Sequence, residues 1–71
     1  MLLGRKVHFE VLAKSDKRWT VYLSSPYKDA AIDQARVLLS SGSVAAVKVT
    51  REGGMKVGED VVFQENLSVI I

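Results

Sequence analysis

Apolar and polar residues alternate along the chain in two periods, and the order of these periods predicts the fold. A period of two, typical of strands with one buried face, runs over residues 7–13 and 19–23 and again over 45–49 and 61–63. Between them, residues 27–39 carry apolar side chains at helical spacing. The pattern predicts an α+β domain of order ββαββ, with a mostly antiparallel sheet of four or five strands and one helix on one face.

Short polar segments mark where these elements begin and end. Ser15, Asp16 and Lys17 predict a tight turn, so that the first two strands form an antiparallel hairpin. Ser25 and Pro26 predict a helix start, with serine as the cap and proline at the first helical position.

Two glycine positions complete this set of boundaries. Gly42 is expected at the left-handed position after the helix. Gly53 and Gly54 predict a turn between the last two strands.

The predicted strands divide their side chains between two faces. Trp19 and Leu23 share one face of the second strand with Val21, and Trp19 is expected to anchor the core. Tyr22 lies on the other face, where Leu12 is the apolar exception among the polar residues of the first strand. One helix covers one face of so small a sheet, so we expect Leu12 and Tyr22 to form an exposed patch that contacts a partner.

The helical stretch places its apolar residues on one side, toward the sheet. These residues are Ala31, Ile32, Ala35, Leu38 and Leu39. The alanines allow the helix to lie close to the sheet, where Val47 and Val49 of the third strand share one face.

The length of 71 residues predicts one domain over 1–71, with a lead-in at 1–6, a core over 7–65 and an apolar strand or tail at 66–71. A chain this short buries only about 60% of the surface that its unfolded form exposes. It has no cysteine, so neither a disulfide nor a thiolate metal site can stabilise it. Association with a second copy is a common way to add buried area.

The final run of the sequence is apolar, β-branched and without charged side chains. On an open sheet edge such a segment promotes aggregation. It is therefore expected either to cover the sheet of its own chain as a fifth strand or to pair with another copy or another protein. The candidate contact residues are Leu67, Val69, Ile70 and Ile71.

The charge distribution indicates a second function class. The net charge is +2, and the first eighteen residues hold five basic side chains against two acidic ones. A basic first hairpin next to aromatic residues is typical of single-strand nucleic-acid binders. The candidate contacts of this alternative are Lys14, Lys17, Arg18, Lys48 and Arg51.

The sequence offers little for catalysis. His8 is the only histidine, and Glu10 lies on the same strand face, where the two can pair. No nucleophile accompanies them, no metal-ligand spacing occurs, and the Gly53-Gly54 pair lacks the phosphate-loop pattern. We expect no enzyme activity, no catalytic residue, no metal, no cofactor and no small-molecule substrate.

The sequence also bears on location. No apolar run approaches the ~20 residues of a membrane span, and residues 1–6 lack the apolar core of a signal peptide. A cytoplasmic location without membrane contact is expected.

Residues 9–49 resemble a small domain of uncharacterised bacterial proteins, with an Arg-Trp strand, an Ala-x-x-x-Ala helix and a Val-x-Val strand. The corresponding residues are Arg18-Trp19, Ala31 with Ala35, and Val47 with Val49. This resemblance implies a bacterial origin and no particular activity. Residues 29–49 are also similar to half of a peptidoglycan-binding SPOR repeat.

The leading hypothesis is a non-enzymatic protein–protein interaction module that self-associates, most simply as a homodimer. The contact surface is the uncovered sheet face, an open sheet edge or the C-terminal strand. The alternative is a nucleic-acid-binding module that uses the basic first hairpin.

Overall fold

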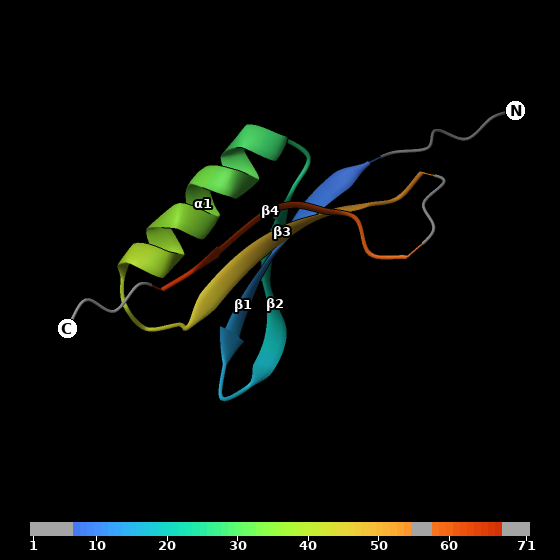
Figure 1. Cartoon of the computed structure of the whole chain (residues 1–71). Helices are drawn as coiled ribbons and strands as arrows, with labels where there is room; N and C mark the ends of the chain where they lie inside the picture. The colour runs from blue at the N-terminus through green and yellow to red at the C-terminus, as the bar shows by residue number, and fades with distance from the viewer. Residues whose placement is uncertain (1–6, 55–57, 68–71) are drawn as a thin grey trace, which may run out of the picture.

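A computed structural model describes residues 7–54 and 58–67, and it contains one antiparallel sheet with one helix packed on one face (Figure 1). The predicted α+β fold of order ββαββ is confirmed, with four strands in the described residues. The elements are β1 (His8–Ser15), β2 (Arg18–Ser25), α1 (Lys28–Ser40), β3 (Ala46–Glu52) and β4 (Val61–Asn66).

The strand order across the sheet is β2-β1-β3-β4. The two central strands, β1 and β3, pair antiparallel with each other, while β2 and β4 form the edges. Helix α1 connects the edge strand β2 to the central strand β3 and lies against one face of the sheet (Figure 1). The opposite face, which we call the open face, carries no helix formed by the described residues.

The core lies between α1 and the two central strands. Its buried members are Val11, Ala13, Ala31, Ala35, Leu39, Val47 and Val49. The predicted apolar side of the helix is confirmed, with Ile32 and Leu38 packed at the margin of this cluster. Because the helix presents alanines where it meets the sheet, the two layers lie close together and the core is thin.

The first turn and the end of the helix match their predictions. Asp16 (φ 53°) and Lys17 (φ 66°) form a two-residue turn between β1 and β2, as expected for a tight antiparallel hairpin. Gly42 (φ 79°) occupies the left-handed position directly after the C-cap residue Ser41.

The start of the helix differs from the prediction. The helix begins at Lys28, with extended Tyr27 as the N-cap residue, so Pro26 precedes the helix and is not its first residue. The Tyr27 N–H donates to Ser25 Oγ at 3.1 Å. The serine side chain thus bonds to the connection before the helix rather than to the first helical turn.

A β-bulge in β2 overturns the predicted faces of this strand. Val11 pairs with Leu23 and Leu12 pairs with Val21, so Tyr22 is an extra residue in β2. One extra residue reverses the alternation of side chains along a strand. Leu23 packs against the core, whereas Trp19 and Val21 lie on the open face. The prediction that Trp19 anchors the core is therefore wrong.

The other edge strand carries a bulge too. Val49 pairs with Phe63 and Thr50 pairs with Val61, which leaves Val62 as the extra residue in β4. Bulges on edge strands disturb the regular row of unpaired N–H and C=O groups that another strand needs for pairing. Both edges of this sheet are therefore poor templates for edge-to-edge association.

Candidate interaction surface

The pairing of the strands places the side chains of the open face in rows that run across the sheet. Residues directly opposite each other in paired strands share a face. The rows, each written from β2 to β4, are Trp19–Lys14–Ala46–Asn66, Val21–Leu12–Lys48–Gln64 and Ser24–Glu10–Thr50–Val61, followed by His8–Glu52 on the central strands alone.

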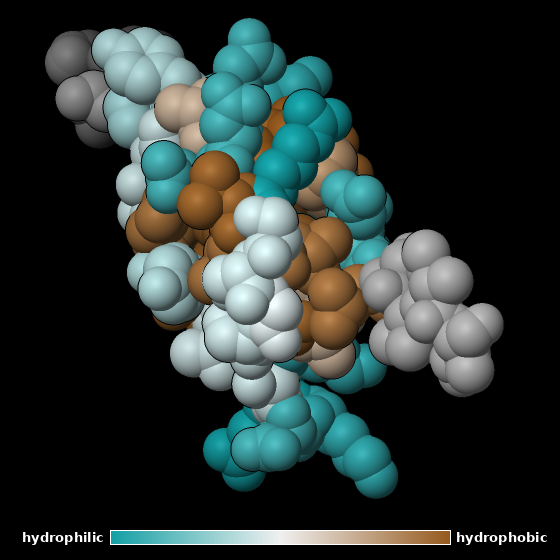
Figure 2. All heavy atoms as spheres, turned by 90° about the vertical axis from the view of Figure 1, so that its left-hand side faces the viewer, coloured by the Kyte–Doolittle hydropathy of each residue, from teal (hydrophilic) through white to brown (hydrophobic). Residues whose placement is uncertain are grey.

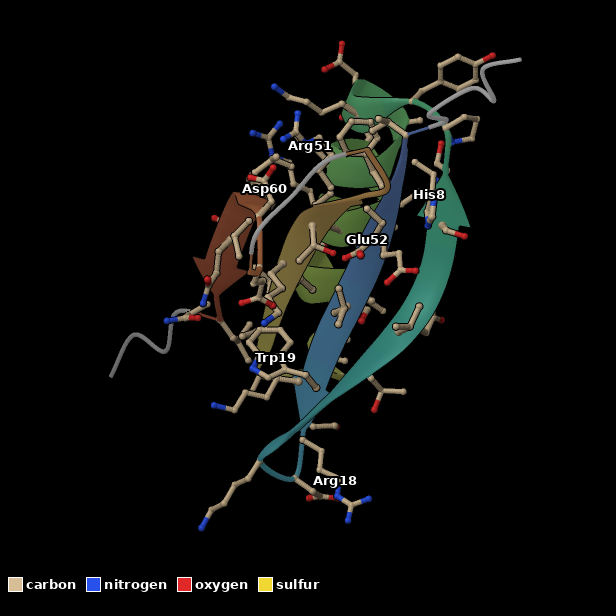
Figure 3. The ribbon with its side chains drawn as sticks, turned by 90° about the vertical axis from the view of Figure 1, so that its right-hand side faces the viewer. His8, Arg18, Trp19, Arg51, Glu52 and Asp60 are labelled. Atoms are coloured by element: carbon tan, nitrogen blue, oxygen red, sulfur yellow. The ribbon has the colours of Figure 1, made fainter. Side chains whose placement is uncertain are left out.

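Apolar side chains gather on the β1–β2 half of this face. Val21 is 52% exposed, and Leu12 and Trp19 are half-buried. Figure 3 shows Trp19 on this side of the sheet, with the helix behind the strands. These three residues form the apolar centre of the open face. Apolar groups gathered on a sheet face without a covering layer are typical of a contact surface.

The β3 half of the open face is closed by contacts within the chain. The Lys48 ammonium lies 4.4 Å from the centroid of the Trp19 ring and donates to Glu59 Oε2 at 2.7 Å. Its side chain is only 11% exposed, and Ala46 and Thr50 in the same strand are buried. The accessible parts of the open face therefore lie over β1 and β2 and, beyond the buried β3, over β4, where Val61 is 39% exposed.

Acidic groups occupy one end of this surface. His8 Nε2 lies 3.4 Å from Glu10 Oε2, which confirms the predicted pair, and Thr50 Oγ1 donates to Glu52 Oε2 at 2.9 Å. Figure 3 shows His8 and Glu52 toward the same end of the open face, away from the hairpin turn that Arg18 marks.

Basic groups occupy the other end. Lys14 Nζ lies 5.8 Å from the Trp19 ring centroid, and Lys17 and Arg18 follow in the exposed hairpin. The accessible surface over β1 therefore changes sign along the strand, from Glu10 through apolar Leu12 to Lys14.

The structure separates the two apolar residues that were expected to form one patch. Leu12 lies on the open face, whereas Tyr22, the bulge residue, lines a groove of about 350 Å³ on the helix side of the sheet. That groove is lined by Tyr22, Gln34, Val37, Leu38, Ser41 and Ser43. The predicted Leu12–Tyr22 patch is wrong because the extra residue in β2 moves Val21, and not Tyr22, next to Leu12.

The five basic candidates for nucleic-acid contact are not brought together. Lys14, Lys17 and Arg18 lie at the first hairpin, but Lys48 is held by Glu59. Arg51 pairs in register with Phe9, which packs against the core, so Arg51 belongs to the helix side of the sheet. There its guanidinium lies 2.6 Å from an oxygen of Asp60. Lys48 lies against the Trp19 ring but is held by Glu59. Arg18 pairs with Ser15 and therefore lies on the face opposite Trp19, so the accessible candidates next to this ring are Lys14 and the adjoining turn residue Lys17.

The C-terminal candidates lie mostly beyond what the structure describes. The Leu67 N–H donates to the Ala45 carbonyl oxygen at 2.8 Å, and Leu67 is 40% exposed. It lines a groove between β4 and the helix together with Arg36, Leu39, Ser40, Glu65 and Asn66. Figure 2, seen from the helix side, shows apolar surface on both sides of a weakly polar strip. Val69, Ile70 and Ile71 lie outside the described residues.

Within residues 7–54 and 58–67, no group of three His, Cys, Asp or Glu side chains is placed to hold a metal ion. The same ranges contain no helix with the length and apolarity that crossing a membrane requires. Comparison with family models, curated proteins and solved structures finds no match to this chain. The resemblances to bacterial domains and to half of a SPOR repeat therefore stay predictions.

Proposed function

We propose that this chain is a non-enzymatic interaction module that forms a homodimer through its open face, in the cytoplasm. The observation that carries the proposal is the apolar centre, in which Val21 is 52% exposed beside Leu12 and Trp19 on the side that α1 leaves uncovered. A domain with so thin a core gains stability by burying this centre against a second copy.

The geometry favours the open face over the sheet edges. Edge pairing requires a regular row of unpaired backbone groups, but Tyr22 and Val62 interrupt the two edge strands as bulge residues. Face-to-face packing of two sheets requires only complementary side chains at a sheet separation of about 10 Å. Of the two contact surfaces that the described residues form, the open face therefore has stronger support than the sheet edges.

The size of the sheet limits the strength of the dimer. Four strands about 4.8 Å apart, each about seven residues long, set an upper limit of roughly 450 Å² on the footprint, and the closed part over β3 lowers it. A standard interface buries about 800 Å² per partner. We therefore expect a dissociation constant in the micromolar range or weaker, and a monomer–dimer equilibrium that shifts with protein concentration.

The test compares Val21→Lys with Val37→Lys by sedimentation equilibrium between about 1 μM and 1 mM, the range in which a weak dimer dissociates. The two valines are 52% and 63% exposed, but Val21 lies on the open face and Val37 on the helix. We expect the wild-type chain and Val37→Lys to dimerise, and Val21→Lys to remain monomeric. Circular dichroism checks that both variants are folded.

Two results would contradict the proposal. The first is a wild-type chain that stays monomeric at every concentration. The second is a dimer that Val21→Lys leaves intact. If Val37→Lys dissociates that dimer instead, the contact surface lies on the helix side of the sheet.

A second candidate function, single-strand nucleic-acid binding, is favoured by one specific observation. The Trp19 ring lies on the open face within 5.8 Å of the Lys14 ammonium, next to the exposed basic hairpin. An aromatic ring beside basic groups is the arrangement that stacks on a base and contacts the backbone phosphates.

A labelled single-stranded oligonucleotide titrated at low and high salt tests this candidate. It predicts binding at low salt that weakens steeply as salt rises, and about tenfold or greater loss on Trp19→Ala. The matched control is Tyr22→Ala, an exposed aromatic residue on the opposite side of the sheet. If the oligonucleotide does not bind even at low salt, the nucleic-acid-binding function is ruled out.

A further inference from the structure

We infer that the two open faces pair with their β1 strands antiparallel and crossing at Leu12, so that Glu10 of each copy lies against Lys14 of the other. This inference rests on the proposed function and specifies its geometry. The partner is a second copy of this chain. The reason is that the open-face side chains of β1 are complementary in charge to those of an identical β1 strand that runs in the opposite direction.

The complementarity follows from the positions of three residues in one strand. Glu10, Leu12 and Lys14 follow each other on the open face of β1, and Leu12 lies midway between the two charges. Each charge is two residues, about 7 Å, from Leu12. A two-fold axis that passes through Leu12 and runs across the strands brings each glutamate onto the partner's lysine and stacks the two leucines.

The remaining rows fit the same axis. Val21 shares a row with Leu12 and therefore meets its own symmetry mate, which buries the most exposed apolar side chain of this surface. On β2, Trp19 lies in the row of Lys14 and Ser24 lies in the row of Glu10, on opposite sides of the central Leu12 row. The axis therefore places the Trp19 ring of each copy over Ser24 of the other. Bulky side chains opposite small ones allow the two faces to interdigitate.

Lys48 also lies in the central row, where the axis places it near its symmetry mate. This arrangement is acceptable because its ammonium is bonded to Glu59 Oε2 at 2.7 Å and its side chain is 11% exposed. Each copy thus neutralises its own central lysine.

The alternative two-fold axis runs along the strands and places like charges together. Glu10 then faces Glu10 and Lys14 faces Lys14, with further carboxylate from Glu52 at the acidic end and Lys17 at the basic end. Like charges placed opposite each other across an interface disfavour the complex. The sign change along β1 therefore selects the antiparallel arrangement.

Two charge reversals test this geometry, namely Lys14→Glu and Glu10→Lys. Each variant alone places like charges at both symmetry-related contacts of its homodimer, and we expect its dissociation constant to rise about tenfold or more. A one-to-one mixture of the two variants restores opposite charges at both contacts. The mixture is therefore expected to form heterodimers with close to wild-type affinity, and the double variant is expected to dimerise by itself.

The matched controls are Lys28→Glu and Asp33→Lys, which make the same changes of charge at exposed positions on the helix. They are expected to leave dimerisation unchanged. Sedimentation of the mixture, with one variant carrying a fluorophore, measures the heterodimer directly.

The outcomes separate this inference from the proposed function. If Val21→Lys dissociates the dimer but both charge reversals dimerise like the wild-type chain, the open face is the contact and the antiparallel arrangement is wrong. A mixture that stays as dissociated as its two components also overturns the arrangement. If Val21→Lys has no effect, the proposed function itself fails.

Discussion

Leu39→Ala is expected to lower the free energy of unfolding by about 2–4 kcal/mol, the usual cost of a large-to-small change in a core. Leu39 is 8% exposed and belongs to the core cluster near the end of α1. A domain of 71 residues has a total stability of only about 4–10 kcal/mol. We therefore expect the variant to lose a large share of its stability, measured by urea unfolding followed by circular dichroism.

Val37→Ala is the matched control for this prediction. Val37 lies in the same helix but is 63% exposed, so its truncation leaves no cavity and is expected to change the free energy of unfolding by less than about 0.5 kcal/mol. Equal losses in the two variants would show that α1 does not pack against the sheet through Leu39.

Ala35→Leu is expected to destabilise the domain by about 1–3 kcal/mol, because it adds side-chain volume where there is no space. Ala35 is 0% exposed and lies in the cluster that joins α1 to Val47 and Val49 of the sheet. A leucine at this position forces the helix away from β3 or into an unfavourable rotamer. The decrease in the thermal unfolding midpoint measures the effect, at about 4–8 °C per kcal/mol for a domain of this size.

The control for overpacking is Ala30→Leu in the same helix. Ala30 is exposed, so the added side chain meets solvent rather than the sheet. Both substitutions exchange one strong helix former for another, so helix propensity changes little in either case. A thermal midpoint that falls equally in both variants, or in neither, would contradict the close approach of helix and sheet.

These two predictions concern the side of the sheet that the sequence describes well. The helix-facing valines of β3 and the apolar side of α1 follow simple periods of two and 3.6, and both lie in the core as expected. The hairpin turn at Asp16 and Lys17 and the left-handed Gly42 are also local features, set by residues that are neighbours in the chain. Local periodicity and turn chemistry were sufficient to predict the order of the elements.

The open face was harder to predict because it depends on a single extra residue in β2. Nothing in the order Trp19-Thr20-Val21-Tyr22-Leu23 distinguishes a bulge from regular alternation, since Val21 and Tyr22 are both common in strands. The bulge arises where β2 pairs with β1, and it decides which aromatic residue faces the helix side. Sequence analysis therefore placed Leu12 on the correct face but gave it Tyr22 as a neighbour instead of Val21.

By itself, the sequence determined the α+β class, the order of the strands and the helix along the chain, and the buried side of α1, because each depends on short-range periodicity. Only the tertiary structure decided the spatial order β2-β1-β3-β4, the move of Trp19 and Val21 to the open face, and the pairing of Lys48 with Glu59 across eleven residues. These features depend on strand register and on contacts between distant segments. The charge pattern of β1 was present in the sequence throughout, but it became a candidate contact surface only when the fold left that face uncovered.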